Sequence, residues 1–171
     1  CMSLSKLGLP GVRTGIIIAR EEIVEALTRM TAVLSLSVGS VGPVLVQPLV
    51  KTGEIIKMSR DHIMPFYQKK ALIACAHLKR ELDGIPFKIH LPEGAFFLWL
   101  WIPGLPVTSA ELYEKLKAEG VFVISGHHFF PGMDEDWRHR NECLRLSYSQ
   151  DDDVVENGIR VLGRVVKAIL T

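Results

Sequence analysis

The chain has 171 residues, of which 48% are hydrophobic and 23% charged, and its formal net charge is +1. This composition supports a buried core in one domain or slightly more, and it is unlike that of disordered chains. A net charge close to zero gives no electrostatic reason to expect binding to nucleic acid or to an anionic membrane surface. The longest apolar runs, such as 96–102, are too short to cross a bilayer.

The three cysteines, Cys1, Cys75 and Cys143, show no spacing typical of a metal site. An odd number of such cysteines favours reduced, mostly buried thiols in a cytoplasmic protein over a disulfide or a zinc site.

The first half of the chain is predicted to be mostly helical, and in chain order we expect a turn at 8–11, a buried strand at 15–19, and helices at 20–34, 43–51 and 59–82. The strand is predicted because its residues are apolar and mostly β-branched, and the helices because apolar residues recur at helical spacing. Ser59 is expected to cap the longest helix, and Pro65 is tolerable only near its start. That helix would be about 35 Å long, enough to bridge two domains.

The second half alternates strands and helices, with strands expected at 87–90, 96–101, 121–124 and 143–148, a helix after Thr108 and a last helix opening near 149–153. Thr108 and Glu111 form a capping box, and Gly120 supplies the stop of the same helix. This order predicts a small α+β domain whose sheet is covered on one face by helices. Trp99 and Trp101 share a strand face and are expected to lie in the core or in an interface.

The segment 3–15 combines groups that suit a phosphorylated carbonyl compound. Lys6 and Arg13 flank a Gly-Leu-Pro-Gly turn that bends the backbone and allows both to face one small site. An arginine fork suits a phosphate, the hydroxyls of Ser3 and Ser5 add donors, and a lysine amine can form a Schiff base with a carbonyl. An ordinary strand, turn and strand is the alternative for this short segment.

Arg145 is the second candidate site residue. It stands between Leu144 and Leu146 in an alternating strand, so its side chain is expected on the face opposite the two leucines. The pattern alone leaves two interpretations: a surface arginine with a solvated head, or a guanidinium that binds a carboxylate through two hydrogen bonds.

Four segments together resemble the class I/II aminotransferases, which are fold-type I pyridoxal-phosphate enzymes. They are Ser-x-Ser-Lys with its Gly-Leu-Pro-Gly turn and Arg-x-Gly at 3–15, Pro-x-Gly-Ala-x-Phe-x-Trp at 92–99, Gly-Val-x-Val with Gly-x-x-Phe at 120–132, and Arg-Leu-Ser-Tyr within 144–149. Ser125 departs from the pattern, because the family usually has proline there. Within the family, details of the first three segments are most similar to the branch that uses valine and pyruvate.

The resemblance implies an α/β fold, the C-terminal portion of a fold-type I enzyme. Residues 1–58 would be the end of the large cofactor-binding domain, 59–83 an interdomain helix, and 84–171 the small domain, with a sheet covered by helices. Because the lysine motif follows Cys1 and Met2 immediately, we expect the natural start to lie upstream. The partner of the cofactor's ring nitrogen would lie there too, so this chain alone is expected to be inactive.

The resemblance also implies the roles of single residues. Lys6 would be the catalytic lysine that holds pyridoxal 5'-phosphate, with Ser3 and Arg13 on the phosphate and Ser5 a weaker candidate for the same role. Arg145 would bind the substrate carboxylate. The implied reaction moves an amino group between an amino acid such as valine or alanine and a 2-oxo acid such as pyruvate.

Other implications concern partners and competing functions. A homodimer is implied, in which the loop 35–42 either reaches the neighbouring subunit's active site or is a plain connection between helices. A pyridoxal-phosphate lyase or synthase on the same fold, or a non-catalytic ligand-sensing module, are the alternatives. Adjacent His127 and His128, and His139 near Cys143, do not have metal-ligand spacing, so no metal is expected; His127 could border the substrate pocket.

Overall fold

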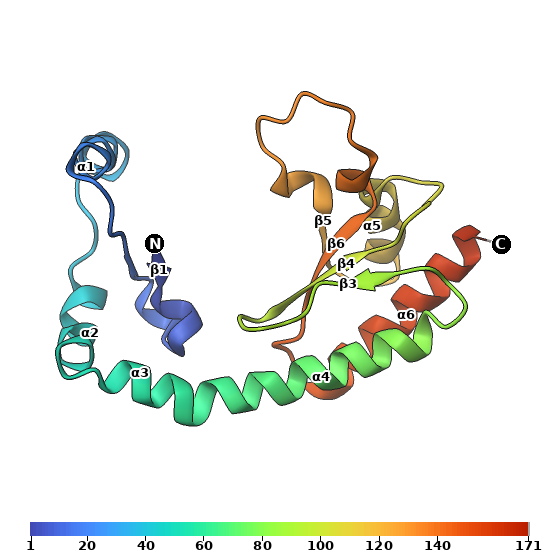
Figure 1. Ribbon diagram of the computed structural model, residues 1–171, viewed down its shortest axis with the longest axis horizontal. Helices are drawn as coiled ribbons and strands as arrows, with labels where there is room; N and C mark the ends of the chain where they lie inside the picture. The colour runs from blue at the N-terminus through green and yellow to red at the C-terminus, as the bar shows by residue number, and fades with distance from the viewer. Residues whose placement is uncertain (171) are drawn as a thin grey trace. The chain divides into compact units, whose positions relative to one another are not determined.

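A computed structural model describes residues 1–170 of the chain (Figure 1). The chain divides into two compact units, Cys1–Pro65 and Phe66–Thr171, which are described one after the other. None of the helices found within residues 1–170 is both long and apolar enough to cross a membrane.

The first unit contains a two-stranded antiparallel sheet and several short helices. Its elements are β1 (Met2–Ser3), the 3-10 turns η1 (Leu4–Leu7) and η2 (Pro10–Val12), β2 (Gly15–Ile16), α1 (Glu21–Ser35), α2 (Val41–Thr52), α3 (Glu54–Met58) and the π-helical turn η3 (Ser59–Ile63). Its buried core includes Leu4, Val46 and Ile55. The helix predicted at 20–34 is confirmed as α1, and the one predicted at 43–51 is confirmed as α2 with Pro43 in its first turn.

The buried strand predicted at 15–19 is wrong over most of its length. Only Gly15 and Ile16 pair, with Ser3 and Met2 of β1. Ile17 and Ile18 are exposed to 53% and 88%. Apolar, β-branched side chains such as these favour burial, but no other part of the first unit covers them.

The prediction that Ser59 caps the longest helix is also wrong. Helical structure begins earlier, at Glu54, directly after Gly53 with its φ of 74°. It then passes Ser59 in a π-helical turn, in which the N–H of Met64 donates to the Ser59 carbonyl. This turn precedes Pro65, which has no N–H to donate and whose ring crowds the backbone of the preceding turn. A local widening of the helix before Pro65 relieves this crowding.

The second unit is an antiparallel sheet packed against helices. Its elements are α4 (Met64–Glu81, whose first two residues belong to the first unit), β3 (Lys88–Ile89), β4 (Phe97–Trp101), α5 (Ser109–Ala118), β5 (Ile124–Ser125), the 3-10 turns η4 (Gly126–Phe129) and η5 (Arg138–Asn141), β6 (Cys143–Ser147) and α6 (Asp152–Leu170). The sheet has the order β3-β4-β6-β5, and all its pairs are antiparallel. The predicted α+β arrangement is confirmed.

One face of this sheet forms the core of the unit. Leu98 and Leu100 of β4 and Leu144 of β6 are buried against the apolar faces of α4, α5 and α6. Trp99 and Trp101 share the opposite, half-buried face, as predicted, and lie outside the core. Their place in an interface, the other alternative, stays a prediction. Large apolar side chains occupy both faces of β4, so the sequence pattern did not show which face lies in the core.

The strand predicted at 121–124 is shifted towards the C-terminus. Only Ile124 and Ser125 pair with β6, and Phe122 is 74% exposed. The neighbouring helix α5 agrees with its prediction: the Thr108 hydroxyl accepts the Glu111 N–H, and the Glu111 carboxylate accepts the Thr108 N–H. Gly120 follows the helix with a φ of 77° and ends it.

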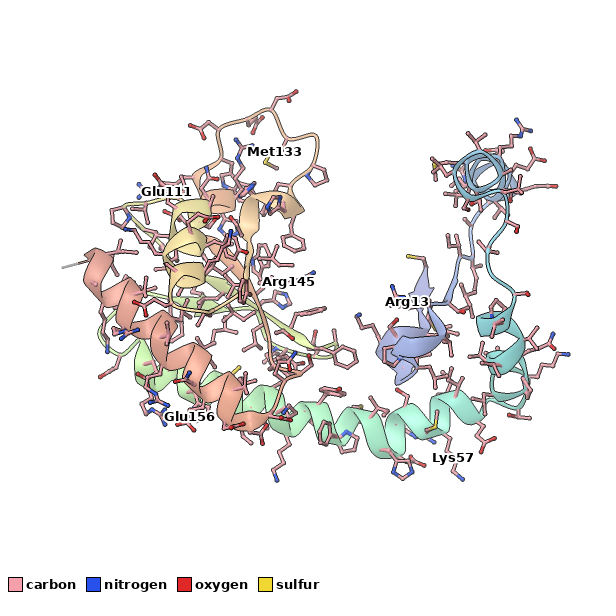
Figure 2. The ribbon with its side chains drawn as sticks, turned by 180° about the vertical axis from the view of Figure 1, so that it is seen from behind. Arg13, Lys57, Glu111, Met133, Arg145 and Glu156 are labelled. Atoms are coloured by element: carbon pink, nitrogen blue, oxygen red, sulfur yellow. The ribbon has the colours of Figure 1, made fainter. Side chains whose placement is uncertain are left out.

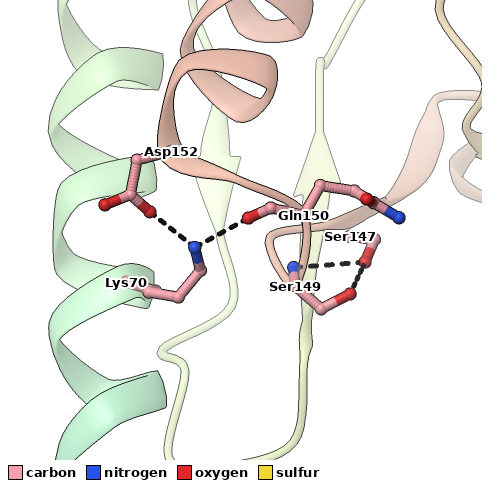
Figure 3. A network of polar contacts seen from close by, with 5 residues as sticks. All are labelled: Lys70, Ser147, Ser149, Gln150 and Asp152. Carbon is pink, nitrogen blue, oxygen red and sulfur yellow. Dashed lines mark hydrogen bonds and ion pairs between the residues drawn. The ribbon is translucent and has the colours of Figure 1, made fainter.

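A polar contact joins α4 to the start of α6. The ammonium group of Lys70 donates to the Gln150 carbonyl at 2.7 Å and to the Asp152 carboxylate (Figure 3). Next to it, the hydroxyls of Ser147 and Ser149 bond each other as the chain leaves β6. Hydrogen bonding to Lys70 lowers the pKa of Asp152. The last helix therefore begins at a position fixed to both α4 and the sheet.

Candidate functional site

Lys6 and Arg13 lie on one tightly folded loop of the first unit. Lys6 is an exposed residue of η1, and Arg13 is exposed directly after η2, with a positive φ of 48° (Figure 2). The N–H of Leu4 donates to the Thr14 carbonyl at 3.1 Å and closes the loop at its base. Lys6 and Arg13 thus belong to the same short closed segment, and that their side chains face one small site stays a prediction.

The two serines of the motif have different environments. Ser3 is exposed on β1 and pairs with Gly15 of β2 at the base of the loop. Ser5 is only 9% exposed and follows the fully buried Leu4. Ser3 is therefore the more accessible of the two hydroxyls, and the phosphate-binding role of both serines stays a prediction.

Two glycines allow the lysine loop to pack closely on helical residues of the same unit. Gly8 has a φ of 102°, and a Cβ there would lie 2.8 Å from Cγ1 of Ile63. A Cβ on Gly42, in the first turn of α2, would collide with the Val12 carbonyl and with the Thr14 hydroxyl. Both contacts fix the loop against its own unit, which limits the freedom of the Lys6 and Arg13 backbones.

Arg145 lies in the second unit, on the central strand β6. Its backbone is paired on both sides, with Trp99 of β4 and with Ile124 of β5. Leu144 and Leu146 point into the core, and Arg145 lies half-buried on the other face, as predicted (Figure 2). The strand therefore holds Arg145 at a defined place on the sheet.

The guanidinium of Arg145 is surrounded by aromatic rings. Its central carbon lies 4.2 Å from the ring centroid of Phe97 and 5.0 Å from that of Phe129. Trp99 packs edge-on against Phe129, with 5.2 Å between ring centroids. Neither phenylalanine was predicted as a site residue, although Phe97 is the phenylalanine of the Pro-x-Gly-Ala-x-Phe-x-Trp segment and Phe129 that of the Gly-x-x-Phe segment.

A buried chain of hydroxyls and imidazole lies next to this cluster and was not predicted. The hydroxyl of Ser125 bonds that of Ser109 at 2.7 Å and Nδ1 of His127 at 2.7 Å. Burial, followed by the charges of His128 and Arg140, lowers the pKa of His127. A neutral His127 is therefore fixed to α5 through Ser125, at the residue where the family pattern has proline.

The histidines and cysteines do not assemble into a metal centre within residues 1–170, where no group of three or more potential ligands is found. The sulfur of Cys143 lies 3.5 Å from Nε2 of His139. Burial raises the pKa of the Cys143 thiol to about 11, so the sulfur stays protonated at neutral pH. Cys1, Cys75 and Cys143 are free thiols.

Comparison with known proteins identifies the family of the chain. The family model for class I and II aminotransferases matches residues 1–162. The chain belongs to the class I and II aminotransferase family. Enzymes of this family depend on pyridoxal phosphate, and the resemblance inferred from the four segments is confirmed.

Individual members of the family are similar over almost the whole chain. Valine–pyruvate aminotransferase of Escherichia coli is 43% identical over 98% of this chain and 40% of its own length. The crystal structure of a putative amino-acid aminotransferase from Psychrobacter arcticum has a TM-score of 0.87 and 45% identity, over 98% of this chain and 39% of that one. That of valine–pyruvate aminotransferase from Salmonella typhimurium has a TM-score of 0.86 and 41% identity, over 99% and 44%.

These matches confirm the fold-type I aminotransferase fold. They also show that the chain spans about 40% of the length of the curated aminotransferases it matches. The chain is therefore similar to a part of those enzymes.

Proposed function

We propose that this chain contributes the catalytic lysine and the carboxylate-binding arginine of a pyridoxal-phosphate-dependent aminotransferase. Its substrates would be an amino acid such as valine or alanine and a 2-oxo acid such as pyruvate. The observation that supports this most strongly is the 43% identity to a valine–pyruvate aminotransferase over 98% of the chain. The placement of Lys6 and Arg13 on one anchored loop agrees with it.

The residues of the lysine loop fit this cofactor by their chemistry. Lys6 supplies an exposed primary amine that can bind the aldehyde carbon covalently. Arg13 supplies a planar cationic fork for the phosphate, and Ser3 an exposed hydroxyl donor. When bound, pyridoxal phosphate takes up the electrons released as the Cα–H bond of the amino acid is broken.

The proposed roles of the protein groups follow from their acidity and charge. The amine of Lys6, once the incoming amino acid has released it, would remove the proton from the amino-acid Cα. The same amine would then deliver a proton to the former aldehyde carbon of the cofactor. Arg145 binds the α-carboxylate through two parallel hydrogen bonds and so orients the Cα–H bond. Valine and pyruvate both carry this carboxylate, so one arginine would serve both halves of the reaction.

The domain arrangement belongs to the same proposal. Residues 1–58 would end the large domain, 59–83 would form the interdomain helix, and 84–171 the small domain of a homodimeric enzyme. The exposed apolar side chains of α1 and of the segment after it, such as Val33, Leu34 and Leu36, support a larger body around the first unit.

The full-length enzyme tests the proposal. We expect it to form alanine from pyruvate only when an amino donor such as valine is supplied, and Lys6→Ala to abolish both turnover and the absorbance band of the bound cofactor. Lys57→Ala, which changes an exposed lysine of α3 in the same unit, is the matched control and should leave both unchanged. Turnover and absorbance retained in Lys6→Ala would refute the proposed role. Conversion of valine without an oxo-acid acceptor would favour a lyase.

A further inference from the structure

The guanidinium of Arg145 is a half-buried cation that is held in place without an anion. Within residues 1–170 the guanidinium contacts the rings of Phe97 and Phe129, and it donates to no carboxylate or carbonyl oxygen of that part of the chain. Two other arginines of the same unit are paired with carboxylates, Arg138 with Glu142 at 2.7 Å and Arg164 with Glu119 at 2.9 Å. Arg145 therefore keeps its positive charge available to a ligand.

Aromatic rings are well suited to this purpose. A ring attracts a guanidinium through its electron-rich face, and the N–H donors at the edge of the guanidinium stay free for a planar anion. An acidic side chain would hold Arg145 equally well, but it would occupy these donors and compete with a carboxylate ligand. Phe97 and Phe129 can thus orient the arginine without reducing its affinity for an anion.

The position of Phe129 is itself determined by the turn η4. Gly126 starts this turn so close to β6 that a Cβ there would lie 2.6 Å from the Cys143 carbonyl oxygen. The Ser125 hydroxyl bonds His127 of the turn on one side and Ser109 of α5 on the other. The turn is thus attached to both β6 and α5, and its last residue, Phe129, reaches the guanidinium.

We propose that Phe97 and Phe129 are positioning residues of the substrate-carboxylate site, and that they hold the guanidinium of Arg145 in the orientation that binds the α-carboxylate. The turn η4, attached through Ser125, His127 and Gly126, keeps Phe129 in place. This inference rests on the proposed function of Arg145, and it assigns to Phe129, 40% exposed, a role beyond packing.

The test uses the full-length enzyme with its cofactor and the variants Phe97→Leu, Phe129→Leu and Phe129→Tyr. We expect each leucine variant to raise the KM for both valine and pyruvate about tenfold, with less than a threefold change in kcat, because ground-state binding of the carboxylate is weakened. Phe129→Tyr keeps the ring and should stay within twofold of the wild type. Phe130→Leu is the matched control, since Phe130 packs against Trp99, Trp137 and His139, whereas the ring contacts of Arg145 are with Phe97 and Phe129.

Two ligands separate positioning from a general loss of structure. The dissociation constant of 3-methylbutanoate, which has the branched chain and carboxylate of valine but no amino group, should rise about tenfold in Phe129→Leu. The reaction of 2-methylpropan-1-amine, which has the amine but no carboxylate, should be unchanged. An amine reaction slowed as much as the valine reaction, or carboxylate binding within twofold of the wild type, would overturn the inference.

The same measurements distinguish failure of the inference from failure of the proposed function. A wild-type enzyme that binds 3-methylbutanoate, weakened in Phe129→Leu, but transfers no amino group would refute the function and support the inference. An active enzyme in which Arg145→Ala raises the KM while both leucine variants do not would refute the inference alone.

Discussion

The two compact units differ in how much apolar surface each buries against itself. In the second unit, three helices cover one face of a four-stranded sheet, and Leu78, Leu100, Leu112 and Leu144 are fully buried among many other core residues. In the first unit, the described core comprises Leu4, Val46 and Ile55, and none of the residues of α1 is buried. The second unit has the core of an independent domain, whereas the first unit buries little of its own apolar surface.

The two residues with proposed roles, Lys6 and Arg145, differ in the same way. Arg145 lies on a central strand with a complete core beneath it, so its position needs nothing outside the second unit. Lys6 lies on a loop that is closed and anchored locally, but the unit around it exposes much of its apolar surface. The arginine is therefore expected to be well placed even in a short chain, and the lysine loop to depend on its surroundings.

The largest expected effect comes from separating the units. A chain of residues 66–171 should unfold cooperatively on heating, followed by circular dichroism, because its sheet and helices share one core. A chain of residues 1–65 should show no cooperative transition, since burial of so few side chains does not offset the entropy of ordering the backbone. A cooperative transition in the 1–65 chain would show that the first unit is also a domain.

A smaller effect is expected from single leucines. Leu144→Ala removes a fully buried side chain and should lower the free energy of unfolding of the second unit by about 2–5 kcal/mol in chemical denaturation. Leu34→Ala makes the same change in α1, where the side chain is 76% exposed, and should change the unfolding free energy measured for the 171-residue chain by about 0.5 kcal/mol or less. Equal effects of the two substitutions would contradict the comparison.

The smallest of these effects concerns a buried carboxylate. Glu142 is 5% exposed and accepts hydrogen bonds from Nε1 of Trp101 and the N–H of Gly104, each at 2.9 Å, beside the guanidinium of Arg138. Burial raises the pKa of Glu142, but these hydrogen bonds and the charge of Arg138 outweigh it, and the pKa lies below its ordinary value of 4.5. Glu142→Gln should cost about 1–3 kcal/mol at neutral pH.

The lowered pKa determines how this cost depends on pH. The charged carboxylate stabilises the fold fully above pH 4.5, and the contribution is lost as the pH falls from 4.5 through the lower pKa of the folded state. The difference in unfolding free energy between wild type and Glu142→Gln should therefore shrink in acid. Glu25→Gln, in an exposed pair with Arg29 in α1, is the control and should have little effect at any pH. A difference that grows in acid would contradict this account.

Local signals explain what the sequence predicted correctly. The capping box of Thr108 and Glu111 and the stop at Gly120 act within one helix, and both are observed. The alternation around Arg145 needs only the pleat of one strand, and its orientation is confirmed. The four segments that resemble the family are distributed over the whole chain, so the sequence alone was sufficient to predict the family.

The errors and omissions come from interactions between distant residues. The apolar, β-branched side chains of Ile17 and Ile18 predict a buried strand, but both are exposed, because burial depends on which other residues pack over a segment. Glu142 meets Trp101 across 41 positions, and Ser109 meets Ser125 across 16, so neither contact has a local signature. The aromatic surroundings of Arg145 likewise come from β4 and η4, which adjoin β6 only in the folded sheet.

The central claim is that Lys6 is the lysine that binds the cofactor, and covalent trapping tests it most directly. The full-length enzyme with bound pyridoxal phosphate is reduced with borohydride, which makes the bond between lysine and cofactor permanent, then digested and analysed by mass spectrometry. We predict that the phosphopyridoxyl group is found on Lys6. Its presence on another lysine, or on none, would contradict the account.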